Sequence, residues 1–276
     1  MGVWAISARA IPSLQAPVQR IAIDATPVPL HPDDPSLTTI GDFRFAGGLE
    51  LKTRQSTLLH ELSDIAMTGA DRFVAVGDGG VLLSARVVLD SKGRLTGVAD
   101  ASLSRLAGMD GRPLTDTNAD AEGLTVLPSG DRLISFERHP RIWLYPRNGV
   151  LPREAPRPNA EFEDNAGIEA IAAAPDLGAD AYLVGEEATG ATWTCRLSTT
   201  CVKGHVVEKP DEFGLVSMTR LPDGLTAYLL RAYDPVRRSR IGLRIFRGTT
   251  LIARLDLAVP MTVDNFEGLT STDAGE

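Results

Sequence analysis

Long apolar runs and an excess of basic residues are both missing from this 276-residue sequence. No uninterrupted apolar run approaches the ~18 residues that a transmembrane helix requires, so no transmembrane segment is expected. The 28 Lys and Arg residues are outnumbered by 36 Asp and Glu residues, which gives a net charge of −8. A general nucleic-acid binder needs a basic face, and we therefore exclude nucleic acid as a partner.

Sustained helical periodicity is missing as well. No apolar pattern with the helical period persists for ~12 residues. Hydrophobic residues nevertheless make up 43% of the chain, enough for a sizeable core, and 26 Gly and 18 Pro residues are spread along it. Short apolar segments separated by turn residues are typical of an all-β fold.

Cysteine is nearly absent, since the chain contains only Cys195 and Cys201. The five residues between them form a predicted turn, which can bring the two sulfur atoms within bonding range across a hairpin. An exported protein would hold a disulfide here, whereas a cytosolic one would hold two free thiols. We favour the disulfide. The spacing does not match a CxxC metal or redox site.

The N-terminal residues 1–38 are predicted to be an extended lead-in rather than part of the folded domain. Ala8-Arg9-Ala10 fits the small-x-small pattern of a signal-peptidase site, but the apolar stretch before it is too short for a whole export signal. The segment is therefore either the remnant of such a signal or a plain irregular N-terminus. Residues 11–38 are rich in proline and are expected to lack regular structure.

A repeat of about fifty residues runs through the rest of the chain, which we assign to one domain, residues 39–276. Five short segments look alike and are spaced by 47 to 59 residues. Repeats of ~40–50 residues with several strands each are the signature of propeller blades. The sequence therefore predicts a β-propeller of five or six blades. The five segments are 62–66, 121–125, 168–172, 215–219 and 266–270.

Each repeat predicts a β-hairpin whose open end lies at one rim of the central channel. In the second repeat, folding the chain about its Pro-x-Gly turn places Glu122 opposite Glu137. The first strand of each blade lines the channel, so these hairpin ends should converge. The same construction pairs Ser63 with Asp78, Glu169 with Glu186 or Glu187, and Val216 with Arg231; Glu267 belongs to the fifth repeat.

Carboxylates dominate this predicted rim, and they raise one another's pKa unless something offsets their charge. A divalent cation with oxygen ligands would do so, and so would shared protons or neighbouring arginines. We predict a cation site, with calcium preferred, whose ligands are Asp120, Glu122, Asn165, Glu169, Asn265 and Glu267. The predicted catalytic residues are Glu122, Glu169 and Glu267, and the predicted substrate-binding residues are Asp78, Glu137, Arg138 and Arg231.

An ordered series of short segments resembles a known family. The series is Asp120-Ala-Glu-Gly123, Ser135-Phe-Glu-Arg138, Asn165-x-Gly-x-Glu169, Leu229-Leu-Arg231 and Asn265-Phe-Glu-Gly268. Over roughly residues 40–270 it resembles the phytase-like domain, also called "esterase-like activity of phytase". The resemblance implies an exported bacterial β-propeller, periplasmic or secreted, with a hydrolase label.

Two departures from the family pattern affect the expected site and ring. The family tends to have Ser-Asp-Arg where this chain has Gly77-Asp78-Gly79, so an anion-binding arginine is missing. The chain also ends at Glu276, before the second strand of the last repeat. We expect an incomplete last blade, closed in part by N-terminal strands at Asp42–Phe45 and Leu49–Leu51.

Three functions remain open at this point. The first is a metal-assisted hydrolase that acts on small anionic phosphate or carboxylate esters. The second is a lactonase-like propeller with calcium in its channel. The third is a non-catalytic envelope propeller that binds a small ligand or a protein, because propellers serve all three purposes. A serine-hydrolase site is disfavoured, since the Gly-x-Ser-x-Gly elbow is absent.

Overall fold

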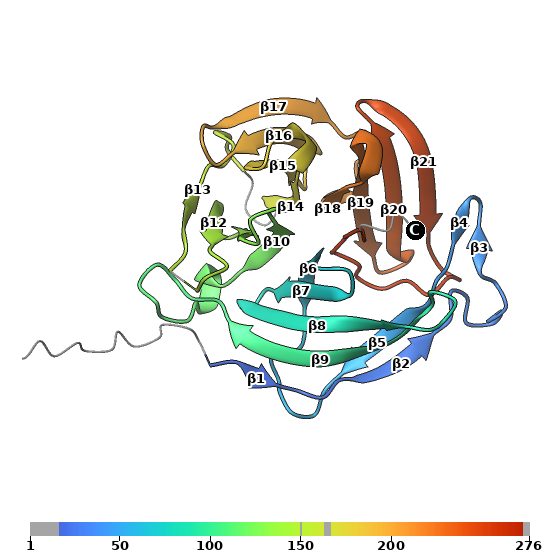
Figure 1. Cartoon of the computed structure of the whole chain (residues 1–276). Helices are drawn as coiled ribbons and strands as arrows, with labels where there is room; N and C mark the ends of the chain where they lie inside the picture. The colour runs from blue at the N-terminus through green and yellow to red at the C-terminus, as the bar shows by residue number, and fades with distance from the viewer. Residues whose placement is uncertain (1–16, 150, 163–166, 273–276) are drawn as a thin grey trace, which may run out of the picture.

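Four antiparallel sheets are arranged radially around a central channel (Figure 1) in the computed structural model, which describes residues 17–149, 151–162 and 167–272. The innermost strands β6, β10, β14 and β18 contact one another in sequence. The protein is therefore an all-β propeller. No helix in the described part of the chain is long and apolar enough to cross a membrane.

Each blade is built from four consecutive strands. Blade 1 holds β6 (Leu62–Met67), β7 (Arg72–Gly77), β8 (Val81–Leu89) and β9 (Leu95–Arg105). Blade 2 holds β10 (Ala121–Val126), β11 (Arg132–Phe136), β12 (Arg141–Tyr145) and β13 (Arg153–Ala155). Blade 3 holds β14 (Ile168–Ala173), β15 (Ala181–Glu186), β16 (Ala191–Arg196) and β17 (Cys201–Val206). Blade 4 holds β18 (Gly214–Arg220), β19 (Leu225–Asp234), β20 (Arg238–Arg247) and β21 (Thr250–Leu257).

The hydrophobic core lies between neighbouring blades, because both faces of each sheet are covered. Between blades 1 and 2, for example, Val76 packs with Leu124, Ile134 and Phe136, and all four side chains are buried. Buried strands of this kind read as nearly continuous apolar runs, which is why helical periodicity is missing from the sequence. Short 3-10 turns at Asp116–Asn118, Pro175–Leu177 and Pro222–Gly224 precede strands.

A β-bulge interrupts the inner strand pair of every blade at the same position of the repeat. The ladder shifts between Leu62 and Asp64, Ala121 and Leu124, Ile168 and Ala170, and Leu215 and Ser217. A bulge inserts an unpaired residue and changes the direction of its side chain. The bulge residues are Ser63, Glu122, Glu169 and Val216, with Gly123 also outside the ladder.

The bulge makes the predicted cross-strand register wrong. Ala121 pairs with Phe136, and the Glu137 amide donates to the Asp120 carbonyl at 3.1 Å, so Glu137 does not lie opposite Glu122 in the ladder. In blade 4, Arg231 likewise pairs with Gly214 and not with Val216. Folding the hairpin symmetrically about its turn ignores the extra residue, so the predicted residue pairs near the rim are out of register.

The last repeat does not form a blade in the described residues, and five or six blades are not confirmed. After β21 the chain turns back toward the channel and passes beside β6 (Figure 1). Gly268 approaches β6 so closely that a Cβ would lie 2.9 Å from the Asp64 Cα, as Gly123 approaches β14. The segment occupies the place of a fifth inner strand, but no partner strand joins it within residues 258–272.

Two short strands lie within the predicted lead-in. β1 (Gln19–Arg20) extends blade 1 by pairing with β9, and β2 (Asp24–Val28) pairs with β5 (Gly48–Lys52). β3 (Thr39–Ile40) and β4 (Phe43–Arg44) form a separate hairpin. The segments predicted to close the last blade thus pair with other N-terminal residues. The predicted signal-peptide remnant lies outside the described residues.

The predicted disulfide is confirmed. Cys195 in β16 and Cys201 in β17 are directly opposed in the ladder, with their Cα atoms 3.9 Å apart and their sulfur atoms bonded. Cys195 is fully buried between blades 2 and 3. The cross-link fixes the outer strand of blade 3 to the strand inside it.

Candidate functional site

A first group of carboxylates lies where blades 1 and 2 meet at the channel rim. Asp78 follows β7, Asp120 precedes β10, and Glu122 is the bulge residue of β10. One carboxylate oxygen from each lies within 4.8 Å of the others. Ser63, the bulge residue of blade 1, donates its hydroxyl to Asp78. The bulges therefore direct side chains from two blades into one acidic group.

A second group joins blades 2 and 3. Glu137 follows β11, Glu169 is the bulge residue of β14, and Glu187 follows β15. Their carboxylate oxygens also lie within 4.8 Å of one another. Of the two residues considered at this position, Glu187 belongs to the group, whereas Glu186 accepts a bond from the Thr189 hydroxyl.

Burial and mutual repulsion raise the pKa of these carboxyl groups. Burial, followed by the charges of Asp78 and Glu137, raises the pKa of Glu122 to about 8. Burial, followed by the charges of Glu187 and Glu122, raises the pKa of Glu169 well above its usual value. Burial is also the main cause that raises the pKa of Asp78 and Glu137. The two groups act on each other, and they form one electrostatic unit.

Two arginines compensate part of this charge. Arg231, on β19, donates to Glu267 and to the Asn265 Oδ1 atom at 3.1 Å, and its Nη2 atom lies 3.6 Å from Glu187. Asn265 also donates to Glu267 at 2.6 Å. Arg138 pairs with Asp120 at 3.0 Å and is about half exposed. Arg231 therefore holds the C-terminal segment against blades 3 and 4, while Arg138 faces solvent.

The five predicted cation ligands that the structure describes lie in three places. Asp120 and Glu122 lie in the first carboxylate group and Glu169 in the second, whereas Asn265 and Glu267 are engaged by Arg231. Asn265 and Glu267 are set apart because the C-terminal segment enters the channel beside blade 1 and pairs with Arg231 of blade 4. Asn165 lies outside the described residues.

Sequence reasoning missed a buried carboxylate in the channel, Asp64. It accepts hydrogen bonds from the Ile65 amide, the Leu124 amide, the Ser217 hydroxyl and the Leu269 amide, at 2.9, 2.7, 2.9 and 3.3 Å. Burial raises its pKa, and these four bonds oppose that rise. One side chain thus joins blades 1, 2 and 4 and the C-terminal segment.

A signal for Asp64 is present in the repeat itself. It occupies the third position of the repeated segment, where the other four repeats have glycine, alanine or serine. Small residues are expected there, because inner strands approach one another closely at that position. A carboxylate in place of a small residue indicates a position with several backbone donors nearby.

The protein is a β-propeller with an oxygen-rich rim, because its antiparallel sheets are arranged radially around a channel whose mouth is acidic. A family model described as "Phytase-like: Esterase-like activity of phytase" matches residues 57–276. The match covers all four blades and the C-terminal segment. The chain therefore belongs to the phytase-like family.

Solved propellers are similar to the chain at low sequence identity, and no curated protein matches it. Virginiamycin B lyase from Staphylococcus aureus is 13% identical, with a TM-score of 0.42 over 76% of this chain and 89% of that one. The Dos1 propeller is 9% identical, with a TM-score of 0.39 over 77% and 52%. The extracellular domain of the B. thetaiotaomicron hybrid two-component system BT4673 is 12% identical, with a TM-score of 0.44 over 80% and 25%. This chain thus spans about half the length of the Dos1 propeller chain and about a quarter of the length of the BT4673 chain.

Proposed function

We propose that the acidic rim is a cation-dependent site that hydrolyses small anionic phosphate or carboxylate esters. The observation that carries this proposal is the pair of adjacent carboxylate groups, each with three oxygen donors within 4.8 Å. Carboxylate oxygens at such spacing suit a hard divalent cation, of which calcium accepts the most ligands and the most varied geometry. The donor set therefore fits the cation.

The first group, Asp78, Asp120 and Glu122, is the better candidate for holding the cation. All three side chains are only partly buried, so that room remains for water and substrate on the solvent side. Such a cation polarises an ester oxygen and acidifies a bound water. A bound cation would also offset the repulsion between these carboxylates, which accounts for why so many of them are gathered on one rim.

Glu169 of the second group is the proposed acid. Burial and the neighbouring Glu187 raise the pKa of Glu169 well above its usual value, and a carboxylic acid with a raised pKa is suited to protonate a leaving group. In the proposed step a water oxygen bonds to the ester carbon or phosphorus, the bond to the leaving oxygen breaks, the Glu169 proton goes to that oxygen, and the proton that the water loses goes to the Glu137 carboxylate. Glu137 is near enough to share and return the proton.

The arginines have different roles in this proposal. Arg138 is about half exposed and forms an ion pair with Asp120, so its guanidinium can also receive the anionic end of a substrate. Arg231 and Glu267 neutralise each other, and they position Glu187 and the C-terminal segment. Glu267 was predicted to be catalytic and is better assigned to this positioning role.

Export to the periplasm or the cell exterior is part of the proposal. The Cys195–Cys201 disulfide supports it, because disulfides persist mainly in oxidising compartments. Extracellular calcium is also more abundant than cytosolic calcium, and extracellular calcium modules bind with dissociation constants of roughly 10⁻⁴–10⁻³ M.

Hydrolysis of a substrate panel with and without chelator tests the proposed activity. We expect purified protein to cleave p-nitrophenyl phosphate or p-nitrophenyl carboxylate esters, to lose this activity in EDTA and to regain it when calcium is added. The panel should include a lactone, because cleavage of the lactone alone would favour the lactonase-like alternative. No turnover of any substrate would refute the hydrolase and leave a binding propeller.

A further inference from the structure

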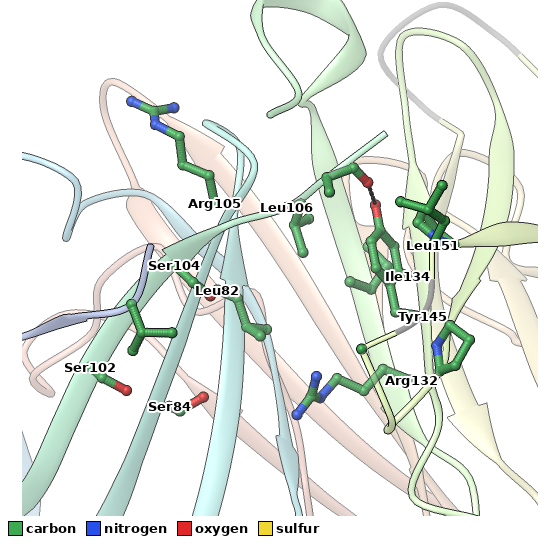
Figure 2. Close-up of a pocket in the computed structure, with 15 residues that line it drawn as sticks. Leu82, Ser84, Ser102, Ser104, Arg105, Leu106, Arg132, Ile134, Tyr145 and Leu151 are labelled. Carbon is green, nitrogen blue, oxygen red and sulfur yellow. Dashed lines mark hydrogen bonds between the residues drawn. The ribbon is translucent and has the colours of Figure 1, made fainter. Parts of the chain in front are cut away.

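A cavity of about 270 Å³ lies between blades 1 and 2, away from the acidic rim (Figure 2). Strands β8 and β9 form one wall, and β11, β12 and the chain that follows β12 form the other. Arg132 begins β11 and Glu137 follows its end, so the Arg132 end of the cavity is separated from Glu137 by the length of that strand, about 16 Å.

Arg132 enters this cavity without an ion-pair partner among the residues that the structure describes. It shares one face of β11 with Ile134, and Figure 2 shows its guanidinium extending from β11 toward the side on which Ser84 lies. Its Nε atom is buried and has no hydrogen-bond partner. Burial lowers the pKa of Arg132. A half-buried, unpaired guanidinium is costly unless an anion binds it.

Serine hydroxyls line the opposite wall. Ser84 in β8 is directly opposed to Ser102 in β9, and Leu82 is directly opposed to Ser104. These four positions form one contiguous patch on the face of blade 1 that looks toward Arg132. This face of blade 1 therefore carries three hydroxyls that can donate hydrogen bonds to an anion.

Apart from Arg105, which also borders the cavity, the rest of its lining is mostly apolar. Leu82, Leu106, Ile134 and Leu151 line it, and Tyr145 presents its ring because its hydroxyl is already bonded to the Ala107 carbonyl at 3.0 Å. An apolar cavity of about 150 Å³ is large enough for benzene. A volume of about 270 Å³ therefore accommodates one ring with a short polar group attached.

We propose that this cavity binds a small organic monocarboxylate with an apolar body, such as an aromatic carboxylate. The guanidinium of Arg132 would pair with the carboxylate in bidentate fashion, the serine hydroxyls would donate to its oxygens, and the ring would lie among the leucine, isoleucine and tyrosine side chains. Inorganic phosphate lacks an apolar body and would leave most of the cavity wall uncovered.

Titration of the full chain with phenylacetate, followed by NMR of backbone amides and the Arg Nε–H groups, tests the site. We expect saturable shifts confined to the cavity residues, and weak or no shifts with phenylethanol, which has the same ring but no charge, or with inorganic phosphate. Arg132→Met should weaken phenylacetate binding roughly 10- to 100-fold, because a charge-assisted pair is lost. Arg254→Met, which changes an exposed arginine of β21, should leave the affinity unchanged.

Thermal unfolding separates this role from a structural one. A ligand-binding Arg132 is not needed by the unliganded fold, so Arg132→Met should keep or raise the melting temperature while binding is lost. A clear fall in the melting temperature of the unliganded variant would overturn the assignment. So would the absence of saturable phenylacetate shifts in the unchanged protein, equal binding of phenylethanol or phosphate, or unchanged affinity in Arg132→Met.

Discussion

Replacement of Asp64 by alanine is expected to lower the free energy of unfolding by about 3 kcal/mol or more. The carboxylate is only 2% exposed and accepts bonds from four donors in three blades and the C-terminal segment. Each buried donor left without a partner costs about 1–3 kcal/mol. Urea unfolding followed by fluorescence measures the change.

Two further variants make this result specific. Asp64→Asn keeps the shape and one acceptor oxygen, so it should cost clearly less than Asp64→Ala. Asp24→Ala, at an exposed position of β2, should change stability by less than about 0.5 kcal/mol. A loss below about 1 kcal/mol for Asp64→Ala would show that Asp64 does not hold the blades together.

Glu169→Gln is expected to lower kcat/KM for ester hydrolysis by about 100-fold or more, because removal of a general acid typically costs 10²–10⁴ in rate. Glu122→Gln should cause a comparable loss, together with weaker calcium dependence. Glu267→Gln should have a smaller effect that appears mainly in KM, since this residue acts through Arg231. Initial rates on the best substrate of the panel measure all three.

The matched control is Glu154→Gln, which changes an exposed glutamate of β13 and should keep full activity. Glu122→Gln and Glu169→Gln are expected to fold, because glutamine removes like charge from a crowded rim. If Glu122→Gln and Glu169→Gln retained the activity of the unchanged protein, the assignment of the rim as a hydrolytic site would be wrong.

Much of the fold could be predicted because the repeat is carried by turn residues and short apolar segments. The Pro-x-Gly turns and the recurrent inner strand are local features, and they indicate a propeller without any knowledge of contacts. The local spacing of Cys195 and Cys201 likewise indicated that a disulfide could form, which the structure confirms. These predictions depend only on residues that are close in sequence.

The details of the site could not be predicted, because they depend on one extra residue in each inner strand pair. A bulge at Glu122 or Glu169 leaves no clear mark in the sequence, yet it displaces the ladder and redirects those side chains. The pairing of Arg231 with Glu267 depends on how residues 258–272 return to the channel. That path also explains why counting repeats predicted more blades than are formed.

A calcium titration by isothermal calorimetry at about pH 6 and pH 9 tests the central claim, that the rim carboxylates form a cation site. Burial and neighbouring charges raise the pKa of Glu122 to about 8, so below that pH its proton must leave before the carboxylate can bind calcium. Affinity should therefore be higher at pH 9, with proton release on binding at pH 6. Glu122→Gln should weaken binding, whereas Glu154→Gln should not. Absence of calcium binding at both pH values, or equal affinity of the unchanged protein and Glu122→Gln, would contradict the account.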